Sequence, residues 1–247
     1  MKIAACVILY NPGESVIDNI QSYIEHVDKL YLIDNTESAS LDFQKNYNSL
    51  SKTIIVQDSL NEGIAKRLNQ ACQLAVKDGL DYLLTMDQDS FFHESIVKKY
   101  FECIQQYLLK EKVAMFGVNY EQEIFNADCN CSIVKILITS GSVINLSNYK
   151  NIGGFDENLF IDFVDTDYCF KSILKGYELV QFSNIYMHHE IGTTTQHRSL
   201  KNMKLSTRSI HSSIRLYYMT RNFLYLQNKY KEHFKQEFSV HKKDLLN

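Results

Sequence analysis

Residues 53–87, TIIVQDSLNEGIAKRLNQACQLAVKDGLDYLLTMD, contain the clearest alternation of strand and helix patterns in the chain. The apolar runs at 53–58 and 81–87 have the length and composition of buried strands. Between them, apolar residues from about Ile64 to Val76 recur at helical spacing, and Asp78-Gly79 is a typical helix stop. Strands that alternate with helices predict a mostly parallel sheet with right-handed crossovers.

The same pattern precedes this stretch. An apolar run at 3–10 ends at Asn11-Pro12-Gly13, residues 14–27 have helical spacing, and LYLI at 30–33 stops at Asp34-Asn35. After an expected helix near 94–110 the pattern is less regular, with strand-like runs at 113–118 and 133–146 and a helix that begins inside 160–171. We expect an α/β fold with a Rossmann-like sheet flanked by helices over 1–195, and a basic helical extension over 196–247.

Composition agrees with a globular protein, because 45% of the 247 residues are hydrophobic and 22% are charged. No apolar run reaches the roughly 18 residues of a spanning helix, and the N-terminus reads as a strand rather than a secretory signal. The cysteines lack the paired spacing of a zinc site, so reduced core thiols in a cytoplasmic protein are predicted. They are Cys6, Cys72, Cys103, Cys129, Cys131 and Cys169.

Charge is distributed unevenly along the chain. Residues 196–247 contain 11 Lys and Arg against 3 Asp and Glu, although the whole chain has a net charge of -3. A basic end on an acidic body is compatible with an anionic partner such as a membrane surface or a lipid diphosphate. A solvated helix face explains the same pattern equally well.

Acidic residues end several of the expected strands. In MDQDS, an apolar strand delivers Asp87 and Asp89 with one residue between them, so both carboxylates lie on the same side of an extended chain. Hard cations such as Mg²⁺ and Mn²⁺ bind such carboxylates together with phosphate oxygens. Asp34 and Asp58 end neighbouring strands and are expected to converge on the same crevice. An acidic loop without a metal is the alternative.

Residues 61–71, NEGIAKRLNQA, offer glycine flexibility and two cations at a helix start. They lack the glycine spacing of a P-loop or of a dinucleotide fingerprint. ATP hydrolysis and NAD binding are therefore disfavoured.

A set of segments occurs in order along most of the chain: VILYNP, DNTES, NEGIAKRLNQA, LLTMDQDS, SGSVI, GGFDENLFIDFVDTDYC, HHEIG and YYMTRN. No single motif is decisive, but the order and spacing of the set are specific. With this set the chain resembles the inverting glycosyltransferases of family 2 with the GT-A fold, in particular their bacterial rhamnosyltransferase-like branch.

The resemblance implies a nucleotide cleft along the strand ends. Tyr10 and Asn11 would border the base and ribose, and Asp34 would reach the base or ribose. Asn61, Gly63 and Arg67 would complete the cleft. Turn roles for Asn11 and Gly63, and a solvated surface position for Arg67, are the alternatives.

The resemblance also implies the catalytic groups. Asp87 and Asp89 match a DXD-type motif that binds donor and metal, with Asp89 the better direct ligand of Mg²⁺ or Mn²⁺. Asp165 falls where the family has its catalytic base, although Val164 replaces the Glu of the usual ED pair. Asp167 would orient the acceptor, unless it and Asp162 only stabilise a helix N-terminus.

His188 and His189 lie where relatives have a histidine that contacts the metal or the diphosphate. His188 is the predicted third metal ligand, with a packing role as its alternative. The late YYMTRN motif at 217–222 is a branch signature whose aromatic residues could equally belong to the core.

The implied reaction is an inverting transfer of a sugar, with L-rhamnose from dTDP-rhamnose as one candidate and UDP-hexoses as another. The expected acceptor is a glycan or a lipid-linked glycan in bacterial surface polysaccharide synthesis. Association with an anionic membrane at the inner face of the plasma membrane is expected, and nucleic acid is not. Metal-dependent nucleotidyl transfer, which gives Asp165 no role, and an inactive binding module are the alternatives.

Overall fold

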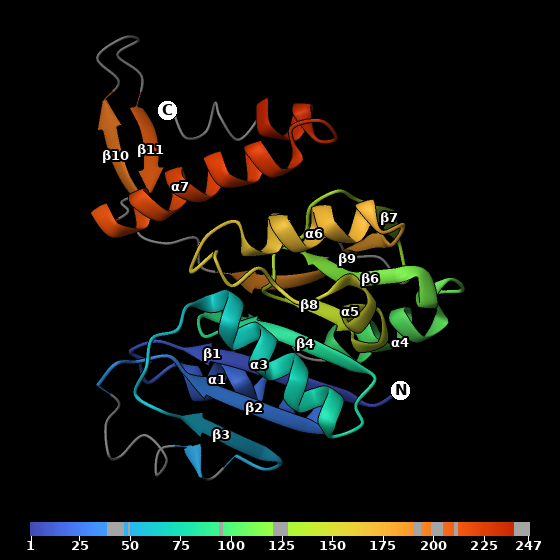
Figure 1. The fold of residues 1–247 in the computed structure, drawn as a ribbon. Coiled ribbons are helices and arrows are strands. Elements are labelled where there is room, and N and C mark those ends of the chain that lie inside the picture. The colour runs from blue at the N-terminus through green and yellow to red at the C-terminus, as the bar shows by residue number, and fades with distance from the viewer. Residues whose placement is uncertain are drawn as a thin grey trace.

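The computed structural model describes residues 1–38, 47–48, 50–93, 96–120, 128–189, 194–198, 205–209 and 212–239. Its centre is a nine-stranded sheet with helices on both faces (Figure 1). The strand order is β3-β2-β1-β4-β8-β6-β9-β5, and β7 pairs with β9. This arrangement confirms the predicted α/β class.

The first half of the sheet is parallel, as residues 53–87 predict. It comprises β1 (Ile3–Leu9), β2 (Lys29–Asp34), β3 (Thr53–Gln57) and β4 (Tyr82–Asp87). The helices between them are α1 (Val16–Gln21), a 3-10 turn (Ile24–His26) and α3 (Ile64–Lys77). Because these strands are parallel, their carboxyl ends lie at one edge of the sheet.

The second half is mixed and largely antiparallel. β8 (Ser142–Asn145) pairs antiparallel with both β4 and β6 (Val113–Asn119), and β6 runs parallel to β9 (Glu178–His189). β5 (Ser90–Phe92) and β7 (Cys131–Ile133) pair antiparallel with β9. The predicted single strand over 133–146 is wrong, because only β8 lies within it apart from the end of β7, and α5 (Leu146–Ile152) begins at its last residue.

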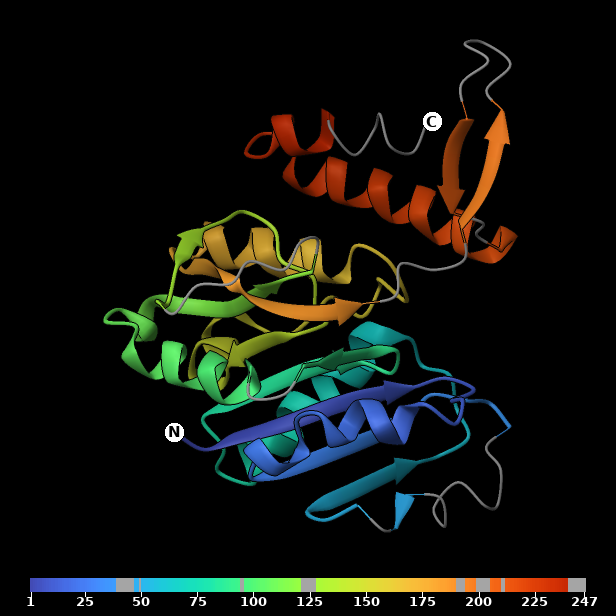
Figure 2. The same cartoon turned by 180° about the vertical axis from the view of Figure 1, so that it is seen from behind.

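Two hydrophobic clusters separate the sheet from its helices. Side chains alternate along β1, so Ala5 and Val7 enter one cluster while Ala4 and Cys6 enter the other. The first cluster lies under α1 and α4 (Ile96–Gln106), and the second under α3, α5 and α6 (Val164–Leu174). Figure 2 shows the α1 and α4 face, opposite the face in Figure 1.

The C-terminal helix α7 (Ser213–Tyr230) lies against α6 (Figure 1). Its Phe223, Leu226 and Tyr230 are buried in the second cluster. A hairpin of β10 (Thr194–Arg198) and β11 (Leu205–Ser209) precedes it, and the expected boundary at residue 195 falls inside β10. The division into 1–195 and 196–247 stays a prediction, although α7 shares a core with the rest of the chain.

The prediction that all cysteines are reduced is wrong for one pair. Cys103 of α4 and Cys129 form a disulfide across a Cα–Cα distance of 5.5 Å. They lie 26 residues apart, and the packing of α4 against the segment before β7 brings them together. Cys6, Cys72, Cys131 and Cys169 are free. The cysteines therefore do not decide the location, and the cytoplasmic location stays a prediction.

Candidate active site

The site begins at the carboxyl ends of β1 and β4. Gln88 lies between Asp87 and Asp89. Its side chain accepts a hydrogen bond from the Tyr10 main-chain N–H at 2.9 Å and donates one to the Tyr10 main-chain oxygen at 3.2 Å. Asn11 has a φ of 45° and donates its main-chain N–H to Thr36 Oγ1 at 2.9 Å. These bonds hold Tyr10 and Asn11 beside the acidic turn, and the Tyr10 side chain stays exposed.

Three potential metal ligands meet next to this turn. Ligand atoms of Asp87, Asp89 and His189 all lie within 4.8 Å of one another. This cluster contains His189 and not the predicted ligand His188, because adjacent residues of a strand point to opposite faces. In β9, His189 pairs with Ser90, whereas His188 pairs with Phe91 and its ring lies 4.6 Å from the Phe91 ring.

Two buried serines support the three ligands. Ser140 Oγ accepts the Asp87 main-chain N–H at 3.1 Å and donates to Ser90 Oγ at 3.0 Å. Ser90 Oγ lies 2.7 Å from His189 Nδ1. Such partners orient the groups that contact a metal. Ser90 follows the DQD sequence and Ser140 begins the SGSVI segment, but sequence spacing alone did not single out either.

The electrostatics of this cluster favour a cation. Desolvation within the cleft is the main cause that raises the pKa of Asp87, and the charges of Asp89 and Asp165 raise it further. His189 and Arg215 oppose the rise. Because like charges disfavour ionisation, a bound cation would stabilise the ionised carboxylates.

Asp165 comes from a different element, the first turn of α6. Burial raises its pKa and the charge of Asp162 adds to the rise, while hydrogen bonds from Thr166 oppose it. The Thr166 main-chain N–H donates to Asp165 Oδ1 at 2.7 Å. A carboxylate with a raised pKa, within electrostatic reach of Asp87, has the properties of a general base.

Two of the residues predicted to bind the nucleotide, Arg67 and Asp34, are buried. Arg67 is fully buried and makes a bidentate pair with Asp58, at 2.9 and 2.6 Å. Asp34 is also fully buried and accepts hydrogen bonds from Thr36 and Gln57. Arg67 thus neutralises Asp58 and Asp34 is enclosed, so the convergence of these two acids with Asp87 and Asp89 on one crevice stays a prediction. Neither side chain is a solvated surface group, which excludes the alternative for Arg67.

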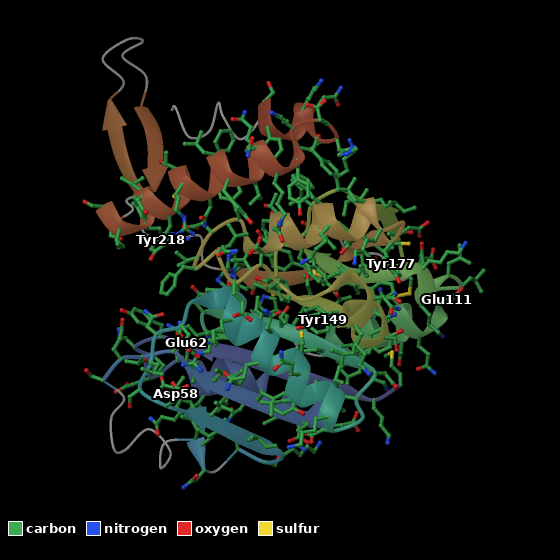
Figure 3. All side chains as sticks on the ribbon, viewed as in Figure 1. Asp58, Glu62, Glu111, Tyr149, Tyr177 and Tyr218 are labelled. Carbon is green, nitrogen blue, oxygen red and sulfur yellow. A yellow bond between two sulfur atoms is a disulfide. The ribbon has the colours of Figure 1, made fainter. Side chains whose placement is uncertain are left out.

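A hydrogen-bonded group next to Arg67 contains Asn35, Asn61 and Gly63, and these residues form one side of the proposed nucleotide site. Asn35, which the sequence placed at a strand end without a specific role, accepts hydrogen bonds from Glu62 N at 2.9 Å and Arg67 Nε at 3.1 Å. It donates to Asn61 Oδ1 at 2.8 Å. Figure 3 shows Asp58 and Glu62 at the same edge of the molecule as Tyr218 of α7. α7 therefore approaches this end of the sheet.

The surroundings of Asp167 do not suit its predicted role, which is to orient the acceptor substrate. Its side chain is fully buried and accepts hydrogen bonds from Lys229 Nζ at 2.7 Å and from the Tyr230 hydroxyl at 2.8 Å. In an α-helix, residues two apart do not share a face, so Asp165 and Asp167 diverge. This geometry favours a structural role in which Asp167 fastens α7 to α6.

The fold and the chain's sequence have known counterparts. No protein-family model matches the chain. The dTDP-rhamnosyl transferase RfbF of Shigella flexneri is 25% identical over 252 residues, which cover 92% of this chain and 80% of that protein.

Solved glycosyltransferase structures share the fold. A structure of GalNAc-T7 with UDP, GalNAc and Mn²⁺ matches with a TM-score of 0.62 and 12% identity over 76% of this chain. S. aureus TarS 1-349 with UDP matches with a TM-score of 0.59 and 15% identity over 78%. The matches span 44% and 61% of those two chains. The chain therefore has the GT-A fold of these glycosyltransferases, and its sequence is similar to that of a dTDP-rhamnosyl transferase.

Proposed function

We propose that this glycosyltransferase transfers a sugar from a nucleoside diphosphate to a glycan acceptor, with inversion at the anomeric carbon. The observation that carries the proposal is the arrangement of Asp87, Asp89 and His189 with Asp165. Three metal-type ligands lie together, and a separate carboxylate with a raised pKa at the start of α6 is close enough to raise the pKa of Asp87.

The residues divide the work of a single displacement. Asp165 accepts the proton of the acceptor hydroxyl. At the same time the oxygen of that hydroxyl bonds to the anomeric carbon, and the bond from this carbon to the diphosphate oxygen breaks. Asp87, Asp89 and His189 would hold Mg²⁺ or Mn²⁺, which supplies Lewis-acid stabilisation of the leaving diphosphate. The imidazole ligand favours Mn²⁺. Tyr10, Asn11, Asn61 and Gly63 lie where the nucleoside would bind.

The donor is proposed from the relatives. The name of the S. flexneri relative specifies dTDP-rhamnose, and the TarS structures contain UDP or UDP-GlcNAc. dTDP-L-rhamnose is therefore the first donor to test and UDP-hexoses the second. The product would contribute to a bacterial surface polysaccharide.

A membrane-borne acceptor is a second part of the proposal. Among the residues that the structure describes, no helix is both long and apolar enough to span a membrane. On α7, however, Ile214, Tyr217 and Leu224 are 63%, 57% and 56% exposed, within a segment rich in Lys and Arg. Exposed apolar side chains next to basic charge suit peripheral binding to anionic lipid at the inner face of the plasma membrane.

The deciding experiment measures release of nucleoside diphosphate from a donor panel, together with the anomeric configuration of the product by NMR. Asp165→Asn keeps the size of the side chain but removes the proton acceptor, so turnover should fall by about 10²- to 10⁴-fold while donor affinity is retained. Nucleotidyl transfer would release pyrophosphate instead, and an inactive binding module would bind donor without turnover. A retained configuration, or normal turnover of Asp165→Asn, would reject the mechanism.

A further inference from the structure

The segment just before Asp165 is held largely by α7. Residues 158–163 connect the Gly153-Gly154 turn to α6, and α7 contacts most of them. Arg221 donates to the Asn158 main-chain oxygen, and Arg215 Nη2 lies 3.2 Å from Asp162 Oδ1. The rings of Phe160 and Tyr218 stack with centroids 5.1 Å apart.

Asn222 provides the central contact. It is fully buried, and its side-chain amide donates to the main-chain oxygens of Ile161 at 2.7 Å and Asp162 at 2.9 Å. Its own oxygen accepts from Arg221 Nε at 2.8 Å and Nη2 at 2.6 Å. Arg221 thus orients the amide so that its N–H groups point to the two carbonyls.

The backbone at this point has an unfavourable conformation. Asp162 and Phe163 have φ values of 62° and 64°, in the left-handed region that non-glycine residues seldom adopt. Phe163 is also the residue before the first turn of α6, which begins at Val164. Surrounding contacts must hold such a conformation, and residues in it occur often at functional sites.

We propose that Asn222, oriented by Arg221, is a positioning residue for Asp165. The inference rests on the proposed function, in which Asp165 is the catalytic base. By binding the carbonyls of Ile161 and Asp162, Asn222 holds the left-handed turn from which α6 starts, and this turn sets the direction of the Asp165 carboxylate. The RN pair of the YYMTRN segment thereby gains a role that sequence alone did not assign.

The same segment touches the nucleotide side, but through a different residue. The Phe160 oxygen accepts the Ile64 main-chain N–H at 2.7 Å at the start of α3. Tyr218 and Ile64 continue to hold Phe160 when Asn222 is changed. Loss of the Asn222 amide should therefore affect the chemical step more than donor binding.

The test uses the full chain with Asn222→Ala and Asn222→Asp. The aspartate keeps the size of the side chain and the contact with Arg221 but has no N–H to donate to the carbonyls. Both variants should lower kcat by about 10- to 100-fold, the effect of a displacement of about 1 Å at a reacting group, with donor Kd changed less than about threefold. Tyr230→Phe, which removes a hydrogen bond elsewhere on α7, is the control and should lower the thermal midpoint without lowering kcat.

A double-mutant cycle separates positioning from general stability. If Asn222 acts through Asp165, Asn222→Asp should cause no further loss of kcat in an Asp165→Asn background. Full additivity of the two losses, or a folded Asn222→Asp variant with wild-type kcat, would overturn the inference while leaving Asp165 as the base. Normal turnover of Asp165→Asn alone would reject the proposed function and the inference with it.

Discussion

The ammonium group of Lys229, near the end of α7, lies 2.7 Å from an oxygen of Asp167, which is fully buried on α6. Lys229 also contacts Asp156 at 2.9 Å. Burial opposes the charge of Lys229, but hydrogen bonds with Asp167 and Asp156 outweigh it and raise the lysine pKa. The positive charge of Lys229, which holds α7 against α6, is therefore maintained throughout the neutral range.

Lys229→Ala should destabilise the protein, because it leaves the carboxylate of Asp167 buried with a reduced set of partners. We expect a loss of about 2–3 kcal/mol in the free energy of unfolding, below the ~3–5 kcal/mol lost when one partner of a deeply buried ion pair is removed, since Lys229 is 33% exposed. Urea unfolding provides the measurement. Lys231→Ala, at an exposed position one residue after α7, is the control, and equal losses for the two variants would contradict the assignment.

Gly63→Ala should disturb the wall of the nucleotide cleft. Gly63 has a φ of 79°, and an added Cβ would lie 2.5 Å from the Phe160 main-chain oxygen. Backbone strain and this clash should together cost at least about 2 kcal/mol. Thermal unfolding and titration with nucleoside diphosphate are the measurements. At Gly13 an added Cβ meets no atom within 4 Å, so Gly13→Ala should behave as the wild type.

The rate should depend on pH through Asp165. A base acts in its ionised form, so kcat should fall as pH decreases through the pKa of Asp165, which burial raises above the ordinary aspartate value. The acid limb should accordingly lie above pH 3.8. Because the Thr166 hydroxyl opposes the rise, Thr166→Val should move this limb to higher pH. An acid limb unchanged by Thr166→Val would argue against this assignment.

Donor binding should depend on a divalent cation, because otherwise Asp87 and Asp89 would face a diphosphate without charge compensation. Asp89→Ala should weaken the response of donor affinity to Mn²⁺ by at least about tenfold and abolish turnover, and His189→Ala should weaken the response less. Calorimetric titration of the donor with and without Mn²⁺ measures this response. His188→Ala, on the opposite face of the strand, is the control. Undiminished turnover in excess chelator would exclude the metal role.

Vesicle binding should follow from the exposed apolar face and the basic charge of the C-terminal segment. Flotation should recover more protein with anionic than with neutral liposomes at low salt, and salt should reduce the difference. Ile214→Ser combined with Leu224→Ser should lower recovery without lowering turnover of a soluble acceptor. Equal recovery with neutral and anionic vesicles would refute electrostatic membrane association.

Much of the fold can be predicted from the sequence, because the spacing of apolar residues depends on the local secondary structure. The apolar runs and helical spacings between Ile3 and Asp87 predict β1 to β4 and α3 within a residue or two. Parallel strands place their carboxyl ends at one edge, so the strand pattern predicts that Asp87 and Asp89 lie at the edge where ligands bind. Asp165 depended on the motif resemblance, since spacing relates only residues that are close along the chain.

Tertiary structure decided which polar residues face the cleft. The sequence cannot distinguish His188 from His189, because only the pairing of β9 with β5 determines which side of the strand faces Asp89. It also cannot show that Arg67 turns inward to Asp58, or that Cys103 meets Cys129. The contact of Asn222 with Ile161 spans 61 residues and exists only because the Asp167–Lys229 pair and a shared core hold α7 against α6. Such long-range contacts depend on the packing of whole elements, which no local pattern encodes.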